Sequence, residues 1–353
     1  MQPIFKPVTS RLLLIQPRLT HQWLNQRSEN RKQCKSTNHS DIIANMLFAF
    51  ALFANSLPQQ TKPISEAPQL TIAPIELKPY AQVTFEVIDE MSGIVKSRKL
   101  KDTYWVHNDS GDSARLFAIR RNGTVITTNT KQAYNGITIS NATNVDWEDI
   151  AIEGDTLYIS ETGNNLNMRK DLCVYAVKEP NPTTATESKF LRRIPISYPD
   201  QTEFPPAKLW NFDCESLAVY KKKLYFVTKW RVSPREPGNG AALYVLDKER
   251  TDGESNVLRK LDTNANLGGW ATAAEISPDG KKLAILIQAP KAGVWIFDMT
   301  KGEKVLSHPL GYVGITKTKQ CEAICWDSPT KLILSNEQRD LFELTVPTNY
   351  PSK

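Results

Sequence analysis

A short phrase recurs five times along this chain, and this repetition constrains the fold more than any other feature. Each copy contains an aliphatic residue at an equivalent position: Ile150, Leu217, Ile276 and Ile324, with Ile94 in a weaker copy. Their residue numbers differ by 56, 67, 59 and 48. Repeats of roughly this length are typical of propellers and solenoids. The sequence therefore predicts an architecture built from similar modules.

Strand-like runs follow each copy. They are rich in β-branched and aromatic residues and are bounded by turn residues, which is the pattern of short β-strands. The first runs are 103–106, 157–160, 224–227, 283–286 and 332–335, and the second runs are 116–119, 173–177, 243–246, 294–297 and 341–344. A further run follows in four repeats, at 124–127, 191–196, 257–261 and 304–308. Four antiparallel strands in each repeat indicate a propeller blade and not a helical repeat.

We therefore expect an all-β fold that forms a single β-propeller of four-stranded antiparallel blades. The repeat count predicts five blades, with six as the alternative because residues 70–88 could supply part of another. The last repeat contains only three predicted strands, so its fourth strand must come from elsewhere in the sequence. A strand from 70–77 or 83–88 is expected to complete it and close the ring, which would remove the exposed sheet edges.

The N-terminal part has a different composition. Residues 1–45 hold seven basic residues and two acidic ones, and an apolar run from about Ile42 to Ala54 follows. We interpret 1–56 as a basic leader with a signal-like segment, 57–80 as a proline-rich lead-in and 81–353 as the propeller. The prediction is an exported protein, periplasmic or extracellular, that touches a membrane only through an uncleaved N-terminus.

The net charge of +6 lies mostly in that leader. The propeller itself is nearly neutral, so nucleic acid is not an expected partner. A small anionic ligand or an extracellular partner is expected instead, with the protein a monomer. The four cysteines after residue 45 fit no zinc spacing and are expected to be buried thiols more than a disulfide.

Acidic residues recur at one position of the phrase. Glu148, Glu215 and Glu322 precede the aliphatic residue by two positions, where Ser92 and Ala274 stand in the other copies. Since the first strand of a blade lines the channel, these glutamates should form part of a ring near the axis. Asp109, Glu161 and Glu337 end or follow the second strands and should reach the same mouth.

Clustered carboxylates oppose their own ionisation, so something must compensate them. A hard cation such as Ca²⁺ is one answer, because it takes six to eight oxygen ligands. The expected metal ligands are Asp109, Glu148, Glu161, Asn165, Glu215 and Glu322. Internal salt bridges from Lys229, Arg231 and His107 are the other answer. The stretches 109–112 and 162–165 are also typical of ordinary tight turns, in which Asp and Asn bond their own backbone.

Three stretches carry a family resemblance. The sequences His107-Asn108-Asp109-Ser110-Gly111-Asp112, Val145-Asp146-Trp147-Glu148-Asp149-Ile150-Ala151 and Glu161-Thr162-Gly163-Asn164-Asn165 resemble a group of bacterial, mostly uncharacterised exported propeller proteins. The similarity covers about residues 85–345. That group more often has Asp-Ile-Gly-Asp-Asn at the last stretch, so Glu161 and Asn164 depart from its pattern. A looser similarity is to WD-repeat-like and phytase-like propellers, the latter being calcium-dependent phosphomonoesterases.

Two functions follow as hypotheses. The first is an exported propeller that binds a ligand or partner at an acidic channel mouth, with a calcium ion. Its ligand contacts would be His107, Asn108, Asp109, Lys229 and Trp230, and Trp230 with Trp270 would offer stacking surfaces. The alternative is a calcium-assisted hydrolase of phosphoesters or esters, phytase-like or esterase-like. A serine nucleophile motif of the Gly-x-Ser-x-Gly type is absent from the sequence.

Overall fold

The computed structural model describes residues 74–347, except 130–132 and 234–235, and this part of the chain is all-β. Its only helices are two 3-10 turns, η1 (Met299–Lys301) and η2 (Val305–Ser307). No helix in these ranges has the length and apolar composition needed to cross a bilayer. The basic leader and the signal-like segment lie outside the described residues.

The strands form antiparallel groups that follow the sequence repeats. The first group is β3 (Met91–Lys96), β4 (Tyr104–Asn108), β5 (Arg115–Ile119) and β6 (Val125–Ile126). The second is β8 (Trp147–Glu153), β9 (Thr156–Glu161), β10 (Cys173–Lys178) and β11 (Glu187–Ser197). The third is β13 (Leu217–Tyr220), β14 (Lys223–Val227), β17 (Ala241–Leu246) and β19 (Arg259–Asn264).

Two more groups complete the series. The fourth is β20 (Gly269–Ile276), β21 (Lys282–Pro290), β22 (Gly293–Asp298) and β23 (Pro309–Thr316). The fifth is β24 (Cys321–Ser328), β25 (Lys331–Asn336) and β26 (Asp340–Thr345), with β2 (Ala81–Gln82) as its fourth strand. The predicted first and second runs of every repeat thus fall within strands of these groups, except that β4 begins one residue later than predicted, at Tyr104.

Short strands link or extend these groups. The strand β7 (Ile137–Ser140) pairs with both β5 and β11, so the first two groups form one continuous sheet. The strand β18 (Asn256–Val257) pairs with β11, and β1 (Ile75–Glu76) pairs with β23. A separate small sheet consists of β12 (Trp210–Asp213), β15 (Lys229–Ser233) and β16 (Glu236–Pro237).

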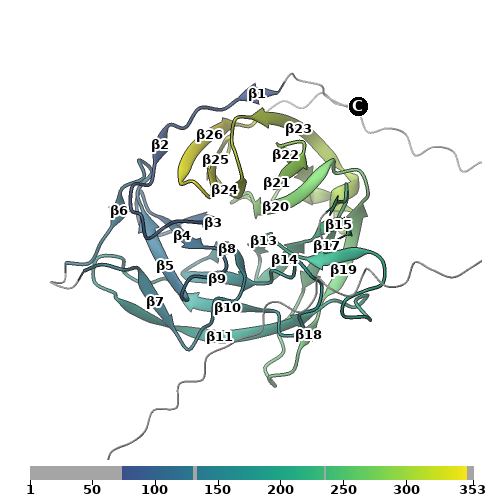
Figure 1. Ribbon diagram of the computed structural model, residues 1–353, viewed down its shortest axis with the longest axis horizontal. Helices are drawn as coiled ribbons and strands as arrows, with labels where there is room; N and C mark the ends of the chain where they lie inside the picture. Colours follow the sequence, from purple (N-terminus) through teal and green to yellow (C-terminus); the bar gives the residue numbers. More distant parts are fainter. Residues whose placement is uncertain (1–73, 130–132, 234–235, 348–353) are drawn as a thin grey trace, which may run out of the picture. The chain divides into compact units, whose positions relative to one another are not determined.

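The groups are arranged around a common centre as in a β-propeller (Figure 1). The innermost strands contact one another in a cycle, in which β3 contacts β8, β8 contacts β13, β13 contacts β20, β20 contacts β24 and β24 contacts β3. A cluster of buried apolar side chains fills each junction between neighbouring groups. The repeated aliphatic residues, such as Ile94 and Leu217, are all buried in these clusters. Burial of apolar surface between groups is therefore what holds the ring together.

The N-terminal end of the described chain closes this cycle. Ala81 pairs with Leu341 and Gln82 with Asp340. Closure by an N-terminal strand was expected, but the strand lies between the two predicted segments. Val83 and Ile88 are instead buried in the cluster between the fifth and first groups, and residues 70–73 lie outside the described residues.

The predicted strand at 304–308 is wrong. These residues include η2, and the fourth strand of that group begins at Pro309. Val305 and Leu306 are both buried, which a strand exposed on one face would not allow for adjacent residues. The turn is also fixed by Asp262, whose carboxylate accepts a hydrogen bond of 2.9 Å from the Ser307 amide.

A buried carboxylate connects three of the innermost strands. Asp149 of β8 is 1% exposed and accepts backbone hydrogen bonds from Ile150 at 2.8 Å, Leu217 at 2.8 Å and Ala274 at 3.4 Å. Burial raises the pKa of Asp149, while the three N–H groups oppose that rise by stabilising the carboxylate. The side chain therefore satisfies backbone donors on β13 and β20, whose residues Leu217 and Ala274 are buried from solvent.

We expect Asp149→Ala to lower the free energy of unfolding by about 3 kcal/mol, because each buried donor left unpaired costs roughly 1–3 kcal/mol. Asp149→Asn keeps one carbonyl oxygen and should cost less. Urea unfolding followed by circular dichroism measures both. The control is Asp155→Ala, an exposed aspartate in the turn between β8 and β9, which should change stability by less than about 0.5 kcal/mol. Equal effects at the two positions would contradict the bridging role of Asp149.

Candidate functional site

The acidic side chains gather at one mouth of the ring because of how each group is connected. The first strand of an antiparallel pair begins where the second strand ends, so residues at these two points share one edge of the sheet. Glu148 lies near the start of β8, Glu215 directly precedes β13 and Glu322 lies near the start of β24. Asp109 and Glu337 follow the ends of β4 and β25.

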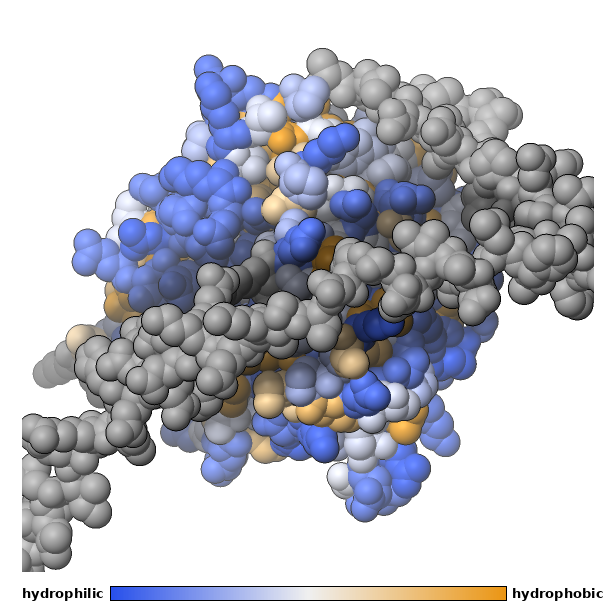
Figure 2. Space-filling view, turned by 45° about the vertical axis from the view of Figure 1, so that its right-hand side comes forward, coloured by the Kyte–Doolittle hydropathy of each residue, from blue (hydrophilic) through white to orange (hydrophobic). Residues whose placement is uncertain are grey.

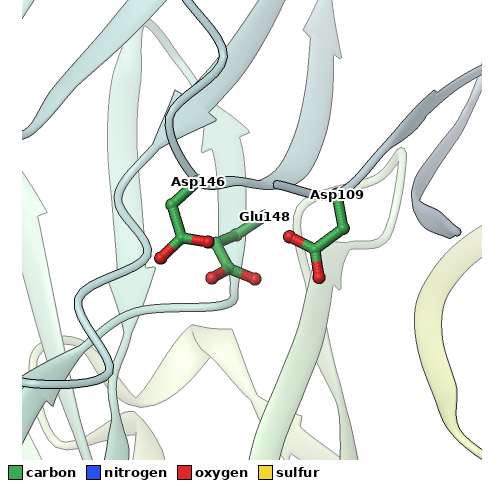
Figure 3. A group of neighbouring side chains, drawn as sticks. All are labelled: Asp109, Asp146 and Glu148. Carbon is green, nitrogen blue, oxygen red and sulfur yellow. The ribbon is translucent and has the colours of Figure 1, made fainter. Parts of the chain in front are cut away.

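Three overlapping groups of carboxylates result. Within each group, one oxygen from every member lies within 4.8 Å of the others. The groups are Asp109 with Asp146 and Glu148, Asp109 with Glu322 and Glu337, and Glu148 with Asp213 and Glu215. Asp109 and Glu148 each belong to two groups, so the seven acids form one connected cluster. Figure 3 shows the first group, in which the three carboxylates point toward one another.

A glycine allows this close approach. A side chain at Gly163 would overlap the Glu148 Oε1 atom and the carboxylate of Asp146. The Gly163 amide also donates a 3.2 Å hydrogen bond to the Asp146 carbonyl, which fixes the loop against the cluster. The space that these two carboxylates occupy therefore exists only because residue 163 has no Cβ atom.

Two cations neutralise one side of the cluster. Lys229 forms an ion pair with Glu215, and Arg231 forms one with Asp213 at 3.1 Å. Both cations lie 4.7 Å from the ring centroid of Trp270, a favourable cation–π distance. The internal salt bridges considered from the sequence are thus present for Glu215 and Asp213.

The opposite side has less compensation. Among the described residues, no ion pair or hydrogen bond reaches the carboxylate oxygens of Asp146 or Glu148, although Arg169 is close enough to Asp146 to act on it electrostatically. Glu322 and Glu337 share a hydrogen bond between their carboxyl groups, which brings no positive charge. The Oε2 atom of Glu215, a residue that is 6% exposed, also lacks a partner. A buried carboxylate oxygen without a donor is costly. The cluster therefore has acceptor capacity that the described protein groups do not use.

Burial and mutual repulsion perturb the acids of the cluster. Burial raises the pKa of Asp146 to about 7 and that of Glu322 to about 9, with like charges from other members adding to the rise. Burial, with repulsion from Glu215, also raises the pKa of Glu148 well above its ordinary range. Burial also raises the pKa of Glu215 to about 7, although contact with the Lys229 ammonium opposes this rise. At neutral pH the cluster consequently retains protons that a bound cation would displace.

Glu161 and Asn165 lie outside the three groups. The Glu161 carboxylate accepts hydrogen bonds from the amides of Val145 at 2.9 Å and Asp146 at 3.1 Å, and pairs with Arg169 at 2.7 Å. Glu161 thereby holds the backbone of Asp146 in place. The Asn165 oxygen accepts a hydrogen bond from Arg231. Both residues contact members or partners of the cluster without joining it.

The expected ligand contacts are mostly interior residues. His107 is fully buried, its ring lies edge-on to Trp147, and burial lowers its pKa to about 4. The buried Asn108 side chain donates to the Val87 carbonyl at 2.8 Å and to Asp89 at 3.0 Å. Trp230 is partly buried, and part of its ring lies against Gly240. Of the expected ligand contacts, only Asp109 and Lys229 are in or beside the cluster.

Asp146 and Asp213 were missed as site residues. Each precedes a cluster glutamate by two positions, so the sequence repeats Asp-x-Glu at 146–148 and 213–215. This repeated spacing was the available signal, because it places a second acid just before each glutamate at the start of an inner strand. The third copy has Gln320 in place of the aspartate.

No known family model matches this sequence, and no curated protein matches it at a significant level. Some solved structures show a distant likeness. A hypothetical selenium-binding protein from Sulfolobus tokodaii shares 12% identity at a TM-score of 0.39, over 74% of this chain and 78% of that chain. A "putative 6-phosphogluconolactonase" from Bacteroides fragilis shares 13% identity at a TM-score of 0.35, over 72% and 84%. At these TM-scores the likeness carries no argument about activity.

A divalent cation held by the Asp109, Asp146 and Glu148 carboxylates would need these groups to stay close together. We therefore expect Gly163→Ala to weaken any such binding at least about tenfold, a change of about 1.4 kcal/mol. The new methyl group would separate Asp146 from Glu148, whose flexible side chains can move without disrupting the strands. Calcium titration by calorimetry measures the effect, and thermal melting of the ion-free protein should change little. The control is Gly314→Ala, where a Cβ atom would make only an ordinary contact with Pro74. Unchanged affinity in Gly163→Ala would contradict this description of the site.

Proposed function

We propose that this protein is an exported, five-bladed β-propeller that binds a divalent cation, with Ca²⁺ the best fit, at its acidic mouth. The cation then helps to hold an anionic ligand or partner. The observation that carries the proposal is the set of closely spaced carboxylates that lack sufficient compensating charge. Five junction clusters and the closed cycle of inner strands support the blade count.

The proposed ligand set differs between the two sides of the cluster. Asp109, Asp146 and Glu148 would hold the cation, because their carboxylates converge and Gly163 leaves room for them. Glu322 and Glu337 would contribute from the other side of Asp109. Glu215 is less suited as a direct ligand because Lys229 already contacts it. An all-oxygen, all-carboxylate set favours Ca²⁺, Mg²⁺ or Mn²⁺ over zinc or copper.

Export is part of the proposal because of the signal-like N-terminal sequence. Extracellular calcium modules bind with dissociation constants of about 10⁻⁴–10⁻³ M. Retained protons and the nearby Lys229 and Arg231 cations would lower the affinity of this cluster. A weak site of that class is consistent with surroundings in which calcium is abundant.

A metal-assisted hydrolase is the second candidate. The favouring observation is that burial raises the pKa of Asp146 and Glu215 to about 7, a value suited to proton transfer at neutral pH. A bound cation would polarise the substrate and activate water. Assays of phosphomonoester and carboxylic-ester substrates, with and without chelator, decide between the candidates. Turnover that disappears with chelator and in Glu215→Gln supports the enzyme, and cation binding without turnover supports the binding protein.

Calcium should bind to the ion-free protein and raise its melting temperature. We expect Glu148→Gln to weaken binding at least about tenfold, since Glu148 belongs to two of the three carboxylate groups. Calorimetric titration measures both proteins. Glu254→Gln, a change at an exposed glutamate remote from the mouth in the sequence and in its contacts, should bind as the wild type does. Absence of binding heat, together with no effect of chelator on melting, would remove the cation proposal.

The stabilisation by calcium should grow with pH. The folded-state pKa of Asp146, about 7, is above its value in an unfolded chain, about 4. The folded protein therefore holds this proton more tightly, and the ion-free protein should lose stability as pH rises from about 4 through about 7. Calcium requires the deprotonated carboxylate, so it should raise the melting temperature more at pH 8 than at pH 5.5. An equal shift at both pH values would argue against Asp146 as a ligand.

A further inference from the structure

A second concave region lies at the edge opposite the acidic mouth. The strand β8 runs from Glu148 at the mouth to Glu153, and the groove is built around its far end. The groove has a volume of about 830 Å³ and lies between the second and third groups of strands. Tyr158, Leu224 and Leu246 contribute apolar surface to it. This volume is within the range of about 300–1,000 Å³ that small-molecule sites occupy.

The acidic residues of the groove already have partners. Arg192 donates to both oxygens of Glu249 at 2.9 Å. Lys223 and Arg259 contact Asp247 at 2.6 and 2.7 Å. Glu153 accepts a 2.8 Å hydrogen bond from the backbone amide of Lys222. Asp247 and Glu249 are therefore neutralised by ion pairs, whereas Glu153 keeps its negative charge beside a neutral amide.

Three lysines of the groove are different. Lys221, Lys222 and Lys248 line it and are exposed. Within the part of the chain that the structure describes, no carboxylate lies within 4.0 Å of their ammonium groups. The ammonium of Lys221 lies 5.1 Å from the centroid of the Tyr220 ring. The groove thus combines an apolar wall with three positive charges that no carboxylate neutralises.

Two of these lysines occupy an unfavourable backbone conformation. Tyr220 pairs with Lys223, so Lys221 and Lys222 form the two-residue turn between β13 and β14. Their φ angles are 51° and 61°. A two-residue turn with both φ angles positive favours Asn-Gly, and other residues are strained there. Lysine at both positions is therefore not explained by the needs of the turn, and strain of this kind often accompanies a binding role.

We propose that this groove is a binding site for an organic anion. The anionic oxygens, phosphate or carboxylate, would contact Lys221, Lys222 and Lys248, and the organic part would lie on Tyr158, Leu224 and Leu246. The site is at the other end of β8 from the acidic cluster and shares no residue with it. It therefore does not depend on the proposed calcium function.

The turn chemistry supplies a test in which the key variant is more stable than the wild type. In the double variant Lys221→Asn, Lys222→Gly, the strained lysines are replaced by the pair that the turn favours. We expect its melting temperature to rise by about 2–4 °C. We also expect its affinity for an anion to fall at least about tenfold. The probes are ATP, citrate and inorganic phosphate, titrated calorimetrically into metal-free protein at low ionic strength, where charge effects are least screened.

Two further variants separate charge from strain. Lys221→Gln with Lys222→Gln removes the charges and keeps the strained backbone, so it should lose binding without becoming more stable. Lys101→Gln, an exposed lysine in the turn between β3 and β4, is the matched control and should bind as the wild type does. Preference for ATP over citrate would identify a phosphate ligand, and the reverse a carboxylate. Failure of all three probes to bind at about 10 mM, or equal affinity in the double variants and the wild type, would overturn the proposal.

Discussion

The hydrogen bonds of the Asp149 carboxylate are the interaction on which the centre of this ring depends. Inner strands from different groups meet at the axis without pairing as a sheet, so their inward amides need another acceptor. Asp149 supplies it to Leu217 and Ala274. Glu148 and Asp149 lie in an irregular part of β8, between the pairs Trp147–Glu161 and Ile150–Ile159, so fixing Asp149 also fixes the backbone of Glu148 beside it. The structural carboxylate and the candidate ligand are therefore neighbours in sequence with different surroundings: one is surrounded by amide donors, and the other by further acids.

The acidic mouth combines two ways of compensating negative charge. On one side, Lys229 and Arg231 form permanent ion pairs with Glu215 and Asp213. On the other side, protons on groups such as Asp146 and Glu322 reduce the charge at neutral pH. Protons can be exchanged for a cation, whereas a tethered lysine cannot leave. This asymmetry is the physical reason for placing the proposed ion near Asp109 and Glu148.

Elsewhere, hydrophilic residues cover much of the face shown in Figure 2, with smaller hydrophobic patches between them.

Much of the inner ring was predictable from the sequence because the repeats are local patterns. Ile150 and Leu217 identify inner strands, and the glutamates two positions earlier then fall at one mouth. The rest depends on contacts between residues far apart in the chain. The role of Glu161 is determined by two amides and by Arg169, and none of these contacts is visible in the pattern around it. Lys229 and Arg231 were expected at the end of a second strand as salt-bridge partners of the acids. They belong to β15, a strand of a small sheet with β12, which the pattern of repeats does not contain.

Strain and charge repulsion are concentrated at the ends of the strands and not in the junctions between groups. The junctions consist of buried apolar side chains, such as Phe226 and Tyr244 between the second and third groups, and they provide most of the favourable free energy. This leaves the loops free to hold arrangements that are locally unfavourable. One mouth gathers carboxylates around Gly163, and the opposite edge holds two lysines in a turn that favours Asn-Gly. Because the two ends carry opposite uncompensated charge and share no residues, changes at one end should leave the chemistry of the other intact.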